Sequence, residues 1–192
     1  PNPAVDVVNS SGPGYLGKRH SRVSSLPDFN GEYPVVAMAD EMLVEGEGQL
    51  KGFMSVAGNP VLSTPNGEKL DEALANLDFM VSLDYFVTET SRHANIILPP
   101  VSPLERDHYD VTFNGFAVHN VAKYSPALFS KNDSEKHDWE IYLELANRLD
   151  KDASEATQKE RAATKAFGPK FLLGQALKYG PYKDVTLDAL ID

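Results

Sequence analysis

The 192-residue chain contains no cysteine. A disulfide, a thiolate zinc site, an iron–sulfur cluster and a catalytic cysteine are therefore excluded within it. It also contains no apolar run long enough to span a bilayer. Basic residues are few, 18 Lys and Arg against 28 Asp and Glu, which gives a net charge of −10. This balance disfavours nonspecific binding to nucleic acid or to anionic lipid, so we expect no nucleic-acid partner and no membrane contact.

The usual sequence motifs of nucleotide-binding and hydrolytic sites are also lacking. There is no Gly-x-Gly-x-x-Gly, no Walker-type phosphate loop and no Gly-x-Ser-x-Gly elbow. The five histidines are scattered, without the spacing of a metal-binding helix. No nucleophile stands at a recognisable spacing from a base. Candidate binding residues must therefore come from the places where strands end.

Residues 50–100 carry the clearest structural pattern of the chain. Three apolar stretches have strand length, at residues 50–57, 79–83 and 95–98. Between the first two, one apolar helical stripe is formed by Leu70, Ala73, Leu74 and Leu77. A short helix is expected over residues 88–94. This β-α-β-α-β run predicts an α/β fold, a three-layer sandwich with a mostly parallel sheet, followed by C-terminal helices.

The remaining segments set the expected domain organisation. Residues 1–35 are rich in turn formers and are expected to be irregular, and residues 135–149 have the apolar spacing of a helix. The composition becomes polar and alanine-rich after residue 150. We therefore predict an α/β domain over residues 1–150 and a helical linker over residues 151–192. Both ends of the chain look cut, which suggests a piece of a larger protein.

Two strand ends carry residues suited to ligand binding. Gly58, Asn59 and Pro60 follow the first strand, and Asp84, Tyr85 and Phe86 follow the second. In parallel sheets ligands bind beyond the carboxyl ends of the strands, so these residues are expected to be neighbours. An ionised Asp84 could accept two hydrogen bonds side by side, as from guanine or a ribose diol. The alternative is that all of these are turn residues and that Asp84 caps the next helix.

Two further segments each allow more than one interpretation. The basic loop that contains Arg19 is either an ordinary surface loop or a loop that presents Arg19 or Arg22 to an anion. Glu105 follows the third strand and is the residue of its segment expected to meet a ligand, while Asp107, His108 and Asp110 have the chemistry of metal ligands without the spacing of a standard site. A hydrogen-bonded loop is the preferred interpretation over a metal site or a carboxylate-based hydrolase.

Several segments together resemble one protein family. Residues 53–63, FMSVAGNPVLS, resemble the Gly-Asn-Pro segment of the molybdopterin-guanine-dinucleotide oxidoreductases, the group of formate dehydrogenase and dimethyl sulfoxide reductase. Residues 77–100, LDFMVSLDYFVTETSRHANIILPP, and residues 136–141, KHDWEI, resemble it too. The resemblance covers residues 45–150 well and the ends more loosely.

The resemblance implies a cofactor-binding fragment of a molybdenum or tungsten oxidoreductase. In the family this stretch is the third of four domains of a catalytic subunit, a dinucleotide-binding type of domain that holds the guanosine end of a molybdopterin guanine dinucleotide. The residues implied near the nucleotide are Gly58, Asn59, Pro60, Asp84, Tyr85, Thr88 and His93. The loop with Arg19 is similar to a cofactor-adjacent loop.

The chain also departs from the family pattern. No match to the family's metal-ligating motif is present, nor are the cysteines of a 4Fe-4S cluster, which we expect elsewhere in the parent protein. The closing β-barrel domain is missing too, so the fragment is expected to be inactive alone. Its implied partners are the remaining domains of the parent, whose redox partner the sequence does not give. We expect a cytoplasmic protein and leave export open. The alternative is a stand-alone nucleotide-binding or protein-interaction module.

Overall fold

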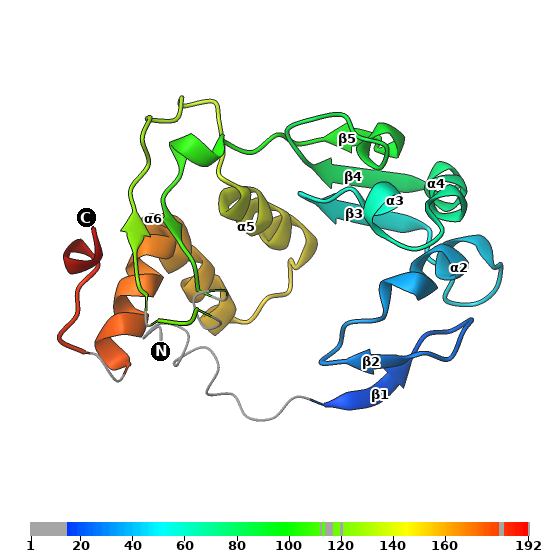
Figure 1. The fold of residues 1–192 in the computed structure, drawn as a ribbon, viewed down its shortest axis with the longest axis horizontal. Coiled ribbons are helices and arrows are strands. Elements are labelled where there is room, and N and C mark those ends of the chain that lie inside the picture. The colour runs from blue at the N-terminus through cyan, green and yellow to red at the C-terminus, as the bar shows by residue number, and fades with distance from the viewer. Residues whose placement is uncertain (1–14, 112, 114–116, 120, 181–182, 192) are drawn as a thin grey trace. The chain divides into compact units, whose positions relative to one another are not determined.

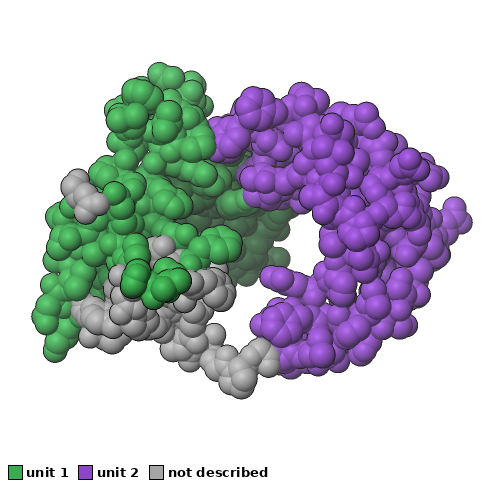
Figure 2. All heavy atoms as spheres, viewed as in Figure 1, with its two compact units in different colours: residues 1–12, 101–192 green, residues 13–100 purple. Residues whose placement is uncertain are grey.

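The computed structural model describes residues 15–111, 113, 117–119, 121–180 and 183–191, drawn as a ribbon in Figure 1. The chain divides into two compact units (Figure 2). The sheet unit is Pro13–Pro100, and the helical unit is Pro1–Gly12 with Val101–Asp192. The boundary expected after residue 150 falls between two helices of the helical unit. The assignment of residues 1–150 to one cofactor domain therefore stays a prediction.

The sheet unit is organised around a parallel sheet. Its three strands are, in spatial order, β3 (Gly52–Val56), β4 (Phe79–Leu83) and β5 (Ile96–Ile97). Val56 pairs with Leu83 at one end of the β3–β4 ladder. Met80 of β4 is fully buried against the helices, and Leu83 is almost fully buried. The alternation of the strands places Met54, Val56, Phe79 and Ile96 on the face opposite Met80, and each of them is 38–49% exposed. The predicted mixed α/β fold with a parallel sheet is confirmed.

Short helices belong to the same unit as this sheet. They are the 3₁₀ helices η2 (Val35–Ala37) and η3 (Ser91–His93) and the α-helices α2 (Met38–Leu43), α3 (Pro60–Ser63) and α4 (Gly67–Ala75). The Asn66 side chain caps α4 by accepting a hydrogen bond from the Lys69 amide at 3.3 Å. The core cluster consists of Met42, Leu70, Ala73, Leu74 and Met80. Each of its large side chains contributes about 1.5–3 kcal/mol through burial.

The expectation that residues 1–35 are irregular is wrong for the described part of that segment. Strands β1 (Leu16–His20) and β2 (Pro27–Phe29) form an antiparallel hairpin. The buried Asp28 carboxylate stabilises it by accepting hydrogen bonds from the amides of Arg19 at 2.8 Å and Gly31 at 3.1 Å. The Arg22 guanidinium then donates to the carbonyl of Val44 at 2.6 Å, next to the end of α2.

The helical unit carries two helices and a short antiparallel strand pair. Its elements are η4 (Pro103–Glu105), β6 (His108–Tyr109), β7 (Tyr124–Ser125), α5 (Asp138–Leu149), α6 (Glu155–Tyr179) and η6 (Asp188–Leu190). Tyr124, Leu177 and Leu187 form its buried cluster. Gly168, at φ +67°, breaks α6 in the middle. The C-terminal helices are thus present, and no helix among the described residues is long and apolar enough to cross a membrane.

Candidate functional site

The candidate site lies where β3 and β4 end. Because these strands are parallel and in register, the Ala57 amide reaches the Leu83 carbonyl at 2.9 Å, and the chain segments that follow lie beside each other. We call residues 57–60 and 84–90 the rim. The structure therefore brings Gly58, Asn59 and Pro60 to the same edge of the sheet as Asp84 and Tyr85, as expected from the order of the strands.

The Asn59 side chain joins the two segments of the rim. Its amide nitrogen Nδ2 donates to Glu89 Oε2 at 2.6 Å, and its Oδ1 accepts from Thr90 Oγ1 at 2.7 Å. Thr90 is fully buried, and its hydroxyl also accepts from the Val61 amide at 3.1 Å. The hydrogen bond from Asn59 is the main reason that the pKa of the Glu89 carboxyl is lowered. Asn59 thus holds the rim together, a role that its spacing in the sequence did not reveal.

The Asp84 carboxylate is partly committed to its own turn. Its Oδ1 accepts hydrogen bonds from the amides of Tyr85 at 2.7 Å and Phe86 at 3.3 Å, and the residue is only 9% exposed. Its Oδ2 accepts no hydrogen bond within the described part of the chain. One carboxylate oxygen, rather than the expected pair side by side, is therefore available to a ligand.

Exposed apolar side chains and one unusual backbone conformation also mark the rim. Phe86 and Val87 are each 74% exposed directly after the Asp84 turn. Ala57 has φ +47°, a conformation uncommon for a residue with a side chain. Such a backbone conformation costs energy and persists only where the surrounding structure maintains it, and such positions are concentrated at functional sites.

Thr88 and His93, both expected near a ligand, are engaged within the protein. The Thr88 amide and hydroxyl bond the Ser91 hydroxyl at 2.7 and 3.1 Å and so form the turn that leads into η3. His93 Nε2 lies 2.6 Å from Asp71 Oδ1 on α4, and Arg92 binds the same carboxylate. These contacts, with Arg92 first, lower the pKa of the Asp71 carboxyl. The two side chains thus fix the position of η3.

Two other predicted residues are not brought to the rim by any described contact. Arg19 lies on β1, with its side chain exposed, and α2 lies between that hairpin and the parallel sheet in Figure 1. Glu105 belongs to the helical unit. Its carboxylate accepts a hydrogen bond from the Ser102 amide at 3.0 Å and so completes the cap of η4. The ligand roles expected for both residues stay predictions.

The chain is similar to one protein family and to several of its members. A model of the molybdopterin oxidoreductase family matches residues 17–148. The assimilatory nitrate reductase catalytic subunit of Bacillus subtilis is 33% identical over 106 residues, which are 55% of this chain and 14% of that protein. The alpha subunit of a formate dehydrogenase from Methanocaldococcus jannaschii is 36% identical over 109 residues, 57% of this chain and 16% of that protein.

A solved structure has a similar fold. Acetylene hydratase from Pelobacter acetylenicus superposes with a TM-score of 0.55 at 20% sequence identity. The match covers 80% of this chain and 19% of that one. The chain therefore spans less than a fifth of the length of each of these three proteins.

Proposed function

The chain belongs to the molybdopterin oxidoreductase family, and we propose that its rim holds the guanosine end of a molybdopterin guanine dinucleotide. The observation that carries this proposal is the meeting of the Gly58–Asn59–Pro60 segment with Asp84 at the carboxyl edge of a parallel sheet. Ligands of open α/β sheets bind at such an edge. The family supplies the class of cofactor, and the rim supplies a place for its nucleotide.

The chemistry of the rim fits a guanine base. Asp84 Oδ2 is a charged acceptor that can receive a hydrogen bond from the N1–H or the amino group of guanine, whereas adenine presents an acceptor at N1. The exposed ring of Phe86 offers a flat apolar surface two residues further on. Asn59 contributes by holding both segments in place. When bound, the cofactor supplies the metal at which the redox chemistry takes place.

The same proposal extends to the larger protein. We propose a molybdenum or tungsten oxidoreductase, in which this chain contributes a layered α/β domain with helices on both faces of the sheet. The other domains of that protein would be its partners and would provide the metal ligand and a 4Fe-4S cluster, because this chain contains no cysteine. A cytoplasmic location is part of the proposal. The substrate and the redox partner are not assigned.

The test is a calorimetric titration of the 192-residue chain with GMP and with AMP. We expect weak binding of GMP and at least several-fold weaker binding of AMP. In Asp84→Asn the Oδ1 acceptor of the turn is retained and Oδ2 is replaced by a donor. This change is expected to weaken GMP binding about tenfold and to remove the preference for guanine.

Asp78→Asn is the matched control. Asp78 is exposed and directly precedes β4, so it lies at the opposite end of the strand that leads to Asp84. The same loss of one negative charge there should leave GMP affinity unchanged. Equal binding of both nucleotides, or equal effects of the two substitutions, would contradict the role of Asp84.

A further inference from the structure

The helical unit contains a cavity of about 980 Å³ that is separate from the rim. Its apolar walls come from β6, β7 and the chain that follows β7, from the start of α5 and from the second half of α6. Trp139 lies beside the stacked ring of His137, with 6.1 Å between ring centroids and 13° between ring planes. Leu128, Phe129 and Leu172 also line it, each at least half exposed. The size and lining are typical of small-molecule sites.

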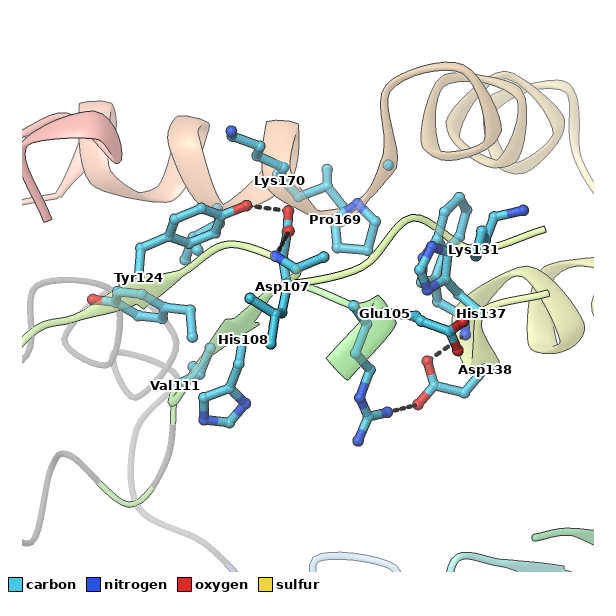
Figure 3. A pocket seen from close by; sticks show the side chains of 18 of the residues that line it. Glu105, Asp107, His108, Val111, Tyr124, Lys131, His137, Asp138, Pro169 and Lys170 are labelled. Carbon is cyan, nitrogen blue, oxygen red and sulfur yellow. Dashed lines mark hydrogen bonds and ion pairs between the residues drawn. The ribbon is translucent and has the colours of Figure 1, made fainter. Parts of the chain in front are cut away.

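The carboxylates of the cavity are already bound by the protein. Glu105 accepts from the Ser102 amide, and Asp107 accepts from the hydroxyl of Tyr124 and, at 2.9 Å, from the amide of Ala127. The third carboxylate, Asp138, accepts from Arg106 and from the Trp139 amide, both at 2.9 Å. Figure 3 shows these hydrogen bonds of Asp107 and Asp138. Asp107 and Asp138 therefore use both carboxylate oxygens in these bonds, and Glu105 uses one.

The cations of the cavity differ in this respect. Arg106 is paired with Asp138, and Lys131 donates to the Glu135 carbonyl at 2.9 Å. Lys170 makes no ion pair among the described residues, and its ammonium group lies 5.1 Å from the centre of the Tyr124 ring. In Figure 3 Lys170 lies at the Tyr124 end of the cavity, away from Lys131 and His137. Since Arg106 faces Asp138 and Lys131 lies 4.0 Å from Glu140, Lys170 is the cation of the cavity that has no anionic partner among the described residues.

We propose that this cavity binds a small amphipathic anion, with a flat apolar body against Trp139 and an acidic group paired with Lys170. Charge complementarity supplies the second contact, because Lys170 gains a partner without displacing one. The proposal is independent of nucleotide binding at the rim, since every residue that lines the cavity belongs to the helical unit.

The protein carries its own reporter for this site. Trp139 is the single tryptophan of the chain and lines the cavity. A ligand that binds there should change its fluorescence directly. The probe is 8-anilinonaphthalene-1-sulfonate, an aromatic sulfonate that combines a flat apolar body with an anion. We expect saturable binding of one probe per chain, together with quenching of Trp139.

Lys170→Gln is expected to weaken binding of this probe about tenfold, since a charge-assisted contact is lost. Lys178→Gln is the matched control, because Lys178 is on the same helix, lies 5.5 Å from the ring centre of Tyr179 and does not line the cavity. The affinity of the Lys178→Gln variant for the probe should equal that of the unsubstituted protein. Binding of several probes per chain, an unquenched Trp139, or equal affinities of the two variants would identify ordinary apolar adsorption and overturn the proposal.

Discussion

Thr90 Oγ1 donates a hydrogen bond to Asn59 Oδ1 at 2.7 Å and thereby connects the two segments of the rim, which lie 31 residues apart in sequence. Thr90 is fully buried, and its hydroxyl also accepts a hydrogen bond from the Val61 amide. The one hydroxyl therefore provides a partner both for the Asn59 side-chain oxygen and for the Val61 amide. The nucleotide-binding role proposed for the rim depends on this connection, because Gly58 and Asp84 must keep a fixed separation.

Thr90→Val should therefore destabilise the sheet unit. The substitution keeps the shape of the side chain but leaves Asn59 Oδ1 and the Val61 amide without their hydrogen-bond partner. We expect the free energy of unfolding to fall by about 1–3 kcal/mol. Urea denaturation followed by circular dichroism measures this loss. Thr164→Val is the control, because the exposed Thr164 hydroxyl bonds only the Glu160 carbonyl one turn earlier. Similar losses in both variants would show that Thr90 has no special role.

A buried hydrogen bond between two serines stabilises the sheet itself. Ser55 Oγ of β3 donates to Ser82 Oγ of β4 at 2.9 Å, and both side chains are buried. Either single change to alanine should cost about 1 kcal/mol, because one hydroxyl loses its partner. The double variant should cost less than the sum of the two. A double-mutant cycle measures this coupling between the two serines. If the double variant lost as much stability as the two single variants together, the coupling would be contradicted.

Asp71 should give the stability of the protein an acid-side pH dependence. Hydrogen bonds from Arg92 and His93 lower the pKa of its carboxyl in the folded state. Its contribution to stability is therefore present above the ordinary aspartate pKa of about 3.9 and is lost as the pH falls through the lower folded value. Asp71→Asn should lower the free energy of unfolding at neutral pH, and the difference from the unsubstituted protein should shrink in acid.

Glu72→Gln provides the control for this pH dependence. Glu72 is the exposed neighbour of Asp71 on α4, so its neutralisation removes the same charge without the contacts to η3. Chemical unfolding at a series of pH values compares the two variants. A constant difference between Asp71→Asn and the unsubstituted protein at every pH would exclude the linkage.

The helical unit has its own buried polar contact, between Tyr124 and Asp107. Burial, and then the hydrogen bond to Asp107, raise the pKa of the Tyr124 hydroxyl. Tyr124→Phe should cost about 1–2 kcal/mol, because Asp107 keeps only its bond from the Ala127 amide. Tyr142→Phe, at a residue that is 38% exposed, should have little effect. Thermal unfolding of both variants checks the prediction, and equal melting temperatures would contradict it.

The sequence predicted the parallel sheet well, because its signals are local. Apolar strands end at Asn59–Pro60 and at Asp84, and the stripe of Leu70, Ala73 and Leu74 is buried as its spacing indicates. The β1–β2 hairpin was missed, since Leu16–His20 shows no alternation of apolar and polar residues, and its stability comes from Asp28.

The interactions at the rim could be predicted less well. That Asp84 follows β4 is evident from the sequence, but the use of its Oδ1 by two backbone amides depends on the turn that the chain adopts. The contact of Asn59 with Glu89 and Thr90 depends on the spatial adjacency of two loops, which no local pattern encodes. The contacts of Glu89 and Thr90 were missed for this reason, although both residues follow a strand end.

The most direct measurement of the central claim is the amide spectrum of the isotope-labelled 21.1 kDa chain during titration with GMP. If the rim holds guanosine, the shifts should concentrate on the amides of Gly58, Tyr85 and Phe86, and AMP at the same concentration should produce little change. Shifts confined to residues 105–139 of the helical unit, or no shifts at all, would contradict the assignment of the rim as the nucleotide site.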